Sequence, residues 1–275
     1  MPLPDFLGIG AQRSGTTWLF NQLLAHPEVY VPPQRKEIHF FDWNYDRGRD
    51  WYEKWFPLGR ESGYRAIGEI TPEYLYDEIV PKRIAETLDD PRFVVLLRHP
   101  VDRAYSQYCF RIQRMGEGRS FEEFYRDRPD VRERSLYSKC LGRFLNHFPK
   151  DRFLVLVYEE VMARPSLAML EIARFLGIDG DKFDEELLTS RIHSSSRRVY
   201  FPLLFSQMRR VGKVLERIEL DRMKNTVSKA LLELFRKNDS MPRLDPALRQ
   251  ELMLEFRDDV AALKEGWNLD LSAWE

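Results

Sequence analysis

An apolar run that leads into a glycine-bracketed loop constrains the fold of this chain more than any other feature. Residues 6–10 are typical of a buried β-strand, and Gly10 and Gly15 bracket a short polar loop before an expected helix over 15–26. Such a strand–loop–helix unit leaves backbone N–H groups unpaired at the positive end of the helix macrodipole. The sequence therefore predicts a site for a phosphate or sulfate group in this loop.

The loop has the Gly-x-x-x-x-Gly spacing of nucleoside-triphosphate-binding loops, but it lacks their lysine. Thr16 stands at the position where such a loop requires lysine. ATPases and kinases also hold Mg²⁺ with an aspartate at a strand end, whereas the apolar run 93–97 ends in Arg98. The cation inside the loop is Arg13, whose planar guanidinium suits two-point contacts with oxyanions. We therefore expect an anion-binding site that does not belong to an ATPase or a kinase.

Apolar runs alternate with segments of helical period along the chain. Strands are expected at 5–10, 65–70, 92–97 and 152–158, and helices at 15–26, 79–89, 101–114, 137–148, 165–176 and 243–265. The fold class is therefore predicted as α/β, a three-layer parallel sheet with helices on both faces and a phosphate-loop-like strand–loop–helix. Because ligands of such sheets bind beyond the carboxyl strand ends, the glycine loop, the turn 69–72 and Arg98 are expected to form one cleft.

Composition and charge exclude several other classes of protein. With 275 residues, 43% of them hydrophobic, and no Pro/Gly/Ser-rich linker, the chain is expected to form one domain over residues 1–275. A net charge of −1 argues against nucleic-acid binding. Cys109 and Cys140 are too few for a metal motif and favour a reducing compartment. Without a signal-peptide pattern or an apolar run of about 20 residues, we expect a cytoplasmic protein with no transmembrane segment.

A second cluster of chemically active side chains lies in the segment 35–42, Arg-Lys-Glu-Ile-His-Phe-Phe-Asp. In an extended segment, Glu37, His39 and Phe41 share one face. A carboxylate and an imidazole that face a common cleft can remove a proton from an acceptor group. The alternative interpretation is a structural ion pair in a capped loop, and the neighbouring anion loop favours the catalytic one.

A third cluster follows the apolar run 93–97. Pro100 favours a helix start, which places Arg98 at the strand edge. Arg103 and Ser106 lie three residues apart, so they are expected to share a helix face. We predict that Arg98 and Ser106 grip a second phosphate, with a surface arginine and a polar helix face as the alternative.

In combination these motifs resemble those of the sulfotransferases that use 3′-phosphoadenosine 5′-phosphosulfate (PAPS). The resemblance is closest to the enzymes that sulfate glucosamine units of heparan sulfate and to their stand-alone bacterial relatives. It covers nearly the whole chain. The segments that carry it are 12–18 (Gln-Arg-Ser-Gly-Thr-Thr-Trp), 36–42 (Lys-Glu-Ile-His-Phe-Phe-Asp), 71–74 (Thr-Pro-Glu-Tyr) and 97–100 (Leu-Arg-His-Pro) with Arg103, Tyr105 and Ser106, and more loosely 158–160, 173–177 and 267–270.

The resemblance implies transfer of a sulfuryl group from PAPS to a hydroxyl or an amine, with 3′,5′-adenosine bisphosphate as the second product and no metal. It assigns the general base to Glu37, the other catalytic roles to Arg13 and His39, and a supporting position to Asp42. The donor-binding residues that it implies are Arg13, Ser14, Gly15, Thr16, Thr17 and Trp18 for the 5′-phosphosulfate, Arg98 and Ser106 for the 3′-phosphate, and Arg197 and Arg198 in a loop that closes over the nucleotide.

The acceptor stays open between a saccharide, a glycolipid, a small phenol or alcohol, and a carrier-tethered acyl chain. Ile70 replaces a lysine of the heparan-type members, which removes a cation expected near the acceptor and argues against a glucosamine polymer. The segment 197–229 has nine Lys/Arg against three Asp/Glu, so it is expected either to meet an acidic acceptor, a carrier protein or a membrane surface, or to be a solvated helix face. Alternative functions are a nucleotide-dependent phosphotransferase, such as an adenylylsulfate kinase, and a non-catalytic nucleotide-binding module.

Overall fold

The computed structural model of the protein describes residues 3–57, 62–189, 198–199, 236–237 and 243–274. Within these residues, five parallel strands form one sheet in the order β2-β3-β1-β4-β5, and two short strands pair antiparallel. The bounds are β1 (Phe6–Gly10), β2 (Val29–Tyr30), β3 (Ala66–Ile70), β4 (Arg92–Leu97) and β5 (Phe153–Val157), with β6 (Arg198–Val199) and β7 (Arg236–Lys237) as the antiparallel pair. The four expected strands are found, whereas β2 is too short to show a pattern in the sequence.

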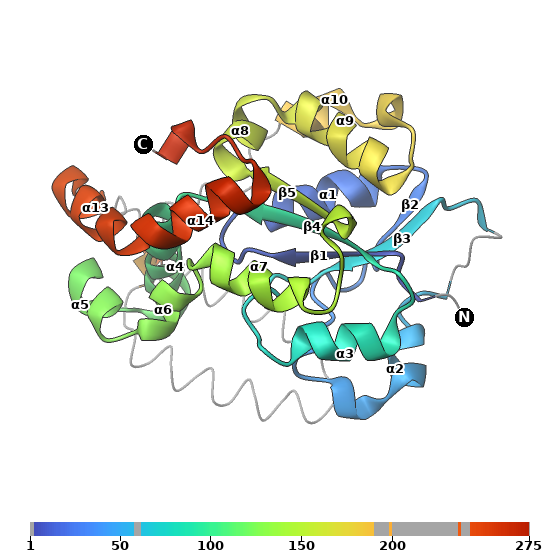
Figure 1. Ribbon diagram of the computed structural model, residues 1–275, viewed down its shortest axis with the longest axis horizontal. Coiled ribbons are helices and arrows are strands. Elements are labelled where there is room, and N and C mark those ends of the chain that lie inside the picture. Colours follow the sequence, from blue (N-terminus) through green and yellow to red (C-terminus); the bar gives the residue numbers. More distant parts are fainter. Residues whose placement is uncertain (1–2, 58–61, 190–197, 200–235, 238–242, 275) are drawn as a thin grey trace.

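Helices cover both faces of the sheet, which confirms the predicted α/β class (Figure 1). Their bounds are α1 (Thr16–Ala25), α2 (Arg49–Glu53), α3 (Val80–Thr87), α4 (Pro100–Met115), α5 (Phe121–Arg126), α6 (Pro129–Glu133), α7 (Tyr137–Leu145), α8 (Tyr158–Ala163), α9 (Pro165–Leu176), α10 (Glu185–Thr189), α13 (Pro246–Met253) and α14 (Arg257–Trp267). None of the helices described here is long and apolar enough to cross a membrane.

The sheet is apolar on both faces, as continuous hydrophobic strands require. In β4, Phe93 and Val95 face one core cluster together with residues of α3, α7 and α14. Val94 and Leu96 alternate with them and face a second cluster with residues of α1 and α9. A third cluster joins α4, α5 and α13, which gather beyond the carboxyl ends of the strands in Figure 1.

Close packing of β1 against its neighbours sets the position of the loop that follows it. A Cβ added to Gly8 would lie 2.8 Å from the Ile70 side chain of β3, and one added to Gly10 would lie 2.7 Å from Cβ of Leu75. Glycine at both positions therefore lets the end of β1 approach β3 and the turn after it.

The expected single helix over 243–265 is wrong, because the structure divides it. The helix α13 ends at Met253, a 3₁₀ turn covers Leu254–Phe256, and α14 begins at Arg257. Phe256 packs in the cluster beside α4, while Leu263 packs in the sheet cluster. The break lets one apolar stretch serve two core clusters, which a straight helix with a single buried face does not do.

Candidate functional site

Three loops at the carboxyl edge of the sheet are joined by main-chain hydrogen bonds. The Ala11 N–H donates to the Leu96 carbonyl of β4 (2.7 Å), and the Thr71 N–H donates to the Gly8 carbonyl of β1 (2.9 Å). Arg98 follows directly after β4. The loop after β1, the turn after β3 and the end of β4 thus lie together, as the sequence predicts.

The loop between β1 and α1 presents a row of free amides. The Ser14 N–H closes the turn on the Ala11 carbonyl (3.2 Å). Arg13 and Gly15 have positive φ angles of 73° and 86°, a left-handed backbone form that occurs in anion-binding nests. In the part of the chain that the structure describes, the amides of Arg13, Gly15, Thr16 and Thr17 are among those of the loop and the helix start that find no acceptor. Such a nest at a helix N-terminus is suited to an anion.

Arg13, Arg98 and Ser106 meet beside this loop. The Arg13 Nε donates to the Ser106 Oγ (3.3 Å), and its guanidinium lies 4.8 Å from the centre of the Phe110 ring. The Arg98 Nη1 donates to the Arg13 carbonyl (3.3 Å). Burial and the charge of Arg98 lower the pKa of Arg13. The predicted pair Arg98 and Ser106 is therefore brought together, with Arg13 between them.

Tyr158 supports both the loop and Arg98. The Arg98 guanidinium lies 5.0 Å from the centre of the Tyr158 ring, within cation–π range. A Cβ added to Gly15 would lie 2.9 Å from two carbon atoms of the same ring. The Tyr137 hydroxyl donates to the Arg98 carbonyl (2.8 Å) and fixes the main chain there. Neither tyrosine was among the predicted site residues.

The prediction that Arg103 and Ser106 share a helix face is wrong. Arg103 is fully buried, and its guanidinium donates to the Ser135 Oγ and to the Val131 carbonyl of α6. Three residues along a helix leave about 60° between the two side chains, which is enough to separate a core position from a cleft position. Arg103 therefore holds α4 to α6 and does not reach the anion loop.

Glu37, His39 and Asp42 form a row of alternating charge. The His39 ring lies 2.7 Å from Asp42 (Nδ1 to Oδ2) and 3.4 Å from Glu37 (Nε2 to Oε2). Burial alone would lower the pKa of His39, but the hydrogen bonds to Asp42 and Glu37 raise it to about 9. Burial alone would raise the pKa of Glu37, but His39 and Lys36 outweigh it and lower that pKa to about 2. Near neutral pH the row therefore holds an imidazolium between two carboxylates.

The segment that carries this row is not extended, so the prediction that Glu37, His39 and Phe41 share one face is wrong. His39 has a φ of 56°, which places it in the left-handed region. As a result Glu37 and His39 contact each other, whereas Phe41 is fully buried in the sheet core.

A buried carboxylate, Glu69, anchors the segment to β3. It accepts hydrogen bonds from the hydroxyls of Tyr52 (2.6 Å), Thr71 (2.7 Å) and Tyr74 (3.0 Å). Thr71 in turn accepts from the Ile38 N–H (3.1 Å). Burial raises the pKa of Glu69. The one signal of this role in the sequence is a carboxylate inside an apolar strand.

Of the remaining predicted donor-binding residues, Ser14 and Trp18 have buried side chains, and the side chains of Arg197 and Arg198 are not described. The Ser14 side chain is fully buried, and the Trp18 indole packs in the core, where it donates to the Leu188 carbonyl (3.4 Å). Trp18 therefore faces the loop only through its main chain. Arg197 lies outside the described residues, and of Arg198 only the main chain in β6 is described.

Two further positions change the sequence-based interpretation. Ile70 is fully buried in the core cluster with α1, so its side chain does not face the cleft. Lys36, which was not among the predicted site residues, contacts the Thr16 hydroxyl (3.2 Å) and Glu37 (2.9 Å). The signal for it is its place directly before Glu37.

Among the described residues, no group of three or more His, Cys, Asp or Glu is arranged to hold a metal ion.

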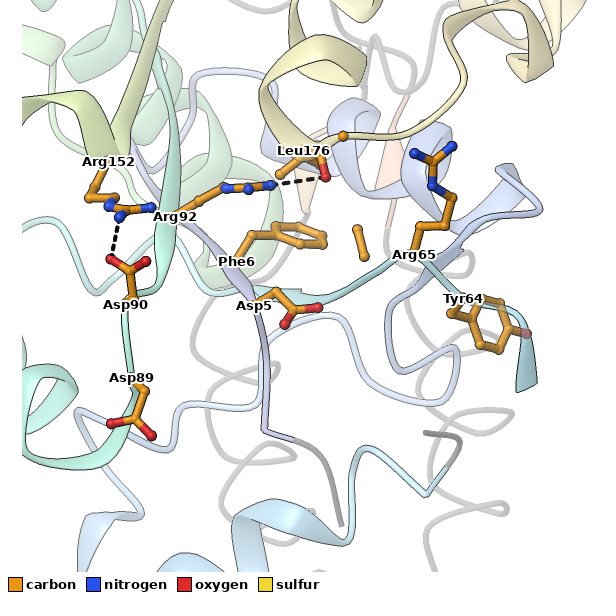
Figure 2. A pocket seen from close by; sticks show the side chains of 11 residues that line it. Asp5, Phe6, Tyr64, Arg65, Asp89, Asp90, Arg92, Arg152 and Leu176 are labelled. Carbon is orange, nitrogen blue, oxygen red and sulfur yellow. Dashed lines mark hydrogen bonds and ion pairs between the residues drawn. The ribbon is translucent and has the colours of Figure 1, made fainter. Parts of the chain in front are cut away.

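A separate cavity of about 580 Å³ lies at the opposite, amino edge of the sheet, where β1, β3 and β4 begin (Figure 2). Three of its charged side chains are engaged with the protein: Asp90 pairs with Arg152 (2.7 Å), and Arg92 donates to the Leu176 carbonyl (3.0 Å). It is therefore distinct from the anion loop.

The sequence of the chain is similar to those of several known proteins. A family model described as a sulfotransferase domain matches residues 3–236. The chain is 32% identical over 212 residues to the mouse (Mus musculus) bifunctional heparan sulfate N-deacetylase/N-sulfotransferase 3, an alignment that covers 70% of this chain and 24% of that relative. It is 36% identical over 138 residues to the membrane-associated sulfotransferase kil1 of Dictyostelium discoideum, covering 48% and 29%. The chain thus spans about a quarter of the length of these relatives.

Solved structures agree with the sequence comparison. The crystal structure of a sulfotransferase from Alicyclobacillus acidocaldarius matches with a TM-score of 0.74 and 25% identity, over 100% of this chain and 99% of that one. The sulfotransferase domain from the curacin biosynthetic pathway matches with a TM-score of 0.50 and 19% identity, over 68% and 77%, and shows the fold alone.

Proposed function

The chain belongs to the sulfotransferase family, and from this premise we propose that it transfers a sulfuryl group from PAPS to a hydroxyl or an amine of an acceptor. The family and the fold class predicted from the sequence are confirmed. The observation that carries the proposal is the nest of amides of Arg13 and residues 15–17, which find no acceptor among the described residues, with the cations of Arg13, Lys36 and Arg98 around it.

The donor has two anionic ends, and the loop has two neighbouring cationic positions. We assign the 5′-phosphosulfate to the free loop amides and the Arg13 guanidinium, and the 3′-phosphate to Arg98 and Ser106. The hydrogen bonds that join Arg13 to Ser106 and Arg98 to the Arg13 carbonyl support this assignment, because they place the two positions side by side. A Cβ at Gly15 would meet the Tyr158 ring, so the loop packs closely against that ring beside the proposed 5′-phosphosulfate position. Arg197 and Arg198 stay proposed as donor contacts.

In the reaction, an acceptor oxygen or nitrogen attacks sulfur, and the bond from sulfur to the bridging oxygen of the 5′-phosphate breaks. The acceptor proton goes to the Glu37 carboxylate, and the electron pair stays on the bridging oxygen, which leaves as part of 3′,5′-adenosine bisphosphate. Arg13 and the loop amides are suited to stabilise that oxygen, because fixed donors favour the charge that develops in the transition state. PAPS supplies the activated sulfuryl group.

Glu37 is proposed as the general base, with a contribution of about 10²–10⁴-fold. His39 is proposed to orient its carboxylate, since Asp42 holds the far side of the imidazolium at 2.7 Å. A carboxylate whose pKa is about 2 is a weak base, so its cationic partners must be redirected before it accepts a proton.

The acceptor proposed is a saccharide, a glycolipid, a small phenol or alcohol, or a carrier-tethered chain, with a hydroxyl favoured over an amine. An aromatic platform beside the base supports a ring-shaped acceptor: Trp43 is 69% exposed and stacks on the His39 ring with centroids 3.8 Å apart. The neighbouring aromatic residues Phe40, Phe41 and Tyr52 are buried in the core. We also propose a reducing compartment such as the cytoplasm, because Cys109 and Cys140 are both free thiols.

The test is release of 3′,5′-adenosine bisphosphate from PAPS with a panel of sugars, glycolipids and phenols. We expect release that depends on the acceptor, and in Glu37→Gln a loss of about 10²–10⁴-fold in kcat with nucleotide affinity retained. Transfer from ATP instead of PAPS would support a phosphotransferase. Nucleotide binding with no turnover on any acceptor would support a non-catalytic module.

A further inference from the structure

Lys36 occupies the place between the anion loop and the carboxylate of Glu37. Its Nζ lies 3.2 Å from the Thr16 Oγ1 and 2.9 Å from the Glu37 Oε1, and its side chain is only 18% exposed. Burial lowers the pKa of Lys36, while the Glu37 carboxylate opposes that change. One ammonium group therefore contacts both the helix that starts at the loop and the proposed base.

This position compensates for what the loop itself lacks. The sequence has Thr16 where a nucleoside-triphosphate loop has lysine, yet the structure brings an ammonium to the same threonine from a different segment. The amides of Thr16 and Thr17 beside it have no acceptor among the described residues. An anion held by those amides would lie next to a partly buried cation, where charge interactions are stronger than in water.

We propose that Lys36 is a further catalytic residue, whose ammonium binds the phosphosulfate end of the donor beside Thr16 and, in turning toward it, releases the carboxylate of Glu37. The inference rests on the proposed function. An ammonium has three donors but one charge, and the phosphosulfate carries more negative charge than a single carboxylate. A bound donor therefore draws Lys36 away from Glu37.

The consequence for catalysis is an ordered exchange of partners. Before the donor binds, Lys36 and Glu37 neutralise each other. With the donor bound, Lys36 stabilises the electron pair left on the bridging oxygen as the sulfur–oxygen bond breaks. Glu37, which then has one cationic neighbour fewer, accepts the proton that the acceptor loses. Charge thus moves from the acceptor to the leaving oxygen with a compensating group at each end.

The test measures nucleotide binding by calorimetry, so that it does not depend on turnover. Lys36→Met is expected to weaken 3′,5′-adenosine bisphosphate about 10- to 100-fold and to leave adenosine 3′-monophosphate unchanged, because the second nucleotide lacks the 5′-phosphate. Arg98→Met is the matched control and is expected to weaken both nucleotides, since both carry a 3′-phosphate. Lys82→Met, at a side chain that is 61% exposed on α3, is expected to change neither.

Two results would overturn the inference and leave the proposed function intact: unchanged bisphosphate affinity in Lys36→Met, or an equal loss for both nucleotides, which a structural role would give. No binding of the bisphosphate to the unaltered protein would instead overturn the proposed function. If Lys36→Met does not fold, Lys36→Gln keeps an N–H donor without the charge and is expected to give the same selective loss.

Kinetics provide a second readout once an acceptor is found. We expect kcat of Lys36→Met to fall about 10²–10³-fold, and Lys36→Arg to recover part of that loss because it keeps the charge. Equal kcat for the methionine and arginine variants would contradict a role for the charge.

Discussion

Replacement of Gly15 by alanine tests whether the loop geometry is as tight as the structure shows. Gly15 has a φ of 86°, and a left-handed conformation costs an alanine about 1–2 kcal/mol. The new Cβ would also lie 2.9 Å from two carbons of the Tyr158 ring, which itself lies beneath Arg98. Overpacking of this kind costs about 1–3 kcal/mol, so the total loss in unfolding free energy is expected to be about 2–5 kcal/mol.

Urea unfolding measures this loss, and two other glycines separate the cost of the left-handed backbone from the cost of the contact with Tyr158. Gly177 has a similar φ of 74° but its Cβ would meet only the Arg92 side chain at 3.9 Å, so Gly177→Ala is expected to lose about 1–2 kcal/mol. Gly142 lies within α7 with nothing within 4 Å of its Cβ, so Gly142→Ala is expected to gain up to about 1 kcal/mol. Equal unfolding free energies for Gly15→Ala and Gly177→Ala would refute the contact with Tyr158. We further expect only Gly15→Ala to lose affinity for 3′,5′-adenosine bisphosphate.

Three further predictions concern the charged row, the C-terminal tryptophan and the choice of nucleotide. Although burial opposes it, hydrogen bonds raise the pKa of His39 from 6.5 to about 9, so its stabilising effect is complete below pH 6.5 and is lost as the pH rises through 9. Unfolding free energy is therefore expected to fall by up to about 3 kcal/mol over that window, and less in Asp42→Asn, as followed by urea titration at each pH; equal slopes would contradict the role of Asp42. The Trp274 Nε1 donates to the Glu159 Oε2 (2.9 Å), whose Oε1 accepts from the His99 N–H (3.0 Å). Trp274→Phe should lower the unfolding free energy by about 1–3 kcal/mol, and an unchanged urea midpoint would show that this bond is not needed. In thermal-shift assays, 3′,5′-adenosine bisphosphate at 100 times its dissociation constant should add about 2.7 kcal/mol, whereas ATP and NAD should add nothing; stabilisation by ATP alone would favour a phosphotransferase.

The parallel sheet was predictable because its strands are buried on both faces and so form apolar runs. The residues 93–97 of β4 show this most clearly, since alternate side chains enter different core clusters and none needs to be polar. The two-residue β2 gives no such signal, and neither does the turn that divides 243–265. That turn depends on which core cluster each apolar residue enters, which is a property of the tertiary structure.

The site was predictable where the chemistry is local and not where side-chain direction decides. The amides of Thr16 and Thr17, which have no acceptor within the described ranges, follow from the loop and helix start alone. Arg103 was misplaced because its role depends on the partner Ser135, 32 residues away, which no spacing rule shows. The contact between Glu37 and His39 depends on the left-handed backbone at His39, which sequence patterns do not predict for a histidine.

A crystal structure of the protein with 3′,5′-adenosine bisphosphate would show whether the loop after β1 holds the donor nucleotide. We expect the 5′-phosphate within hydrogen-bond distance of the Gly15, Thr16 and Thr17 amides, and the 3′-phosphate at Arg98 and Ser106. A nucleotide bound in the cavity at the amino edge of the sheet, with the loop amides facing solvent, would contradict it.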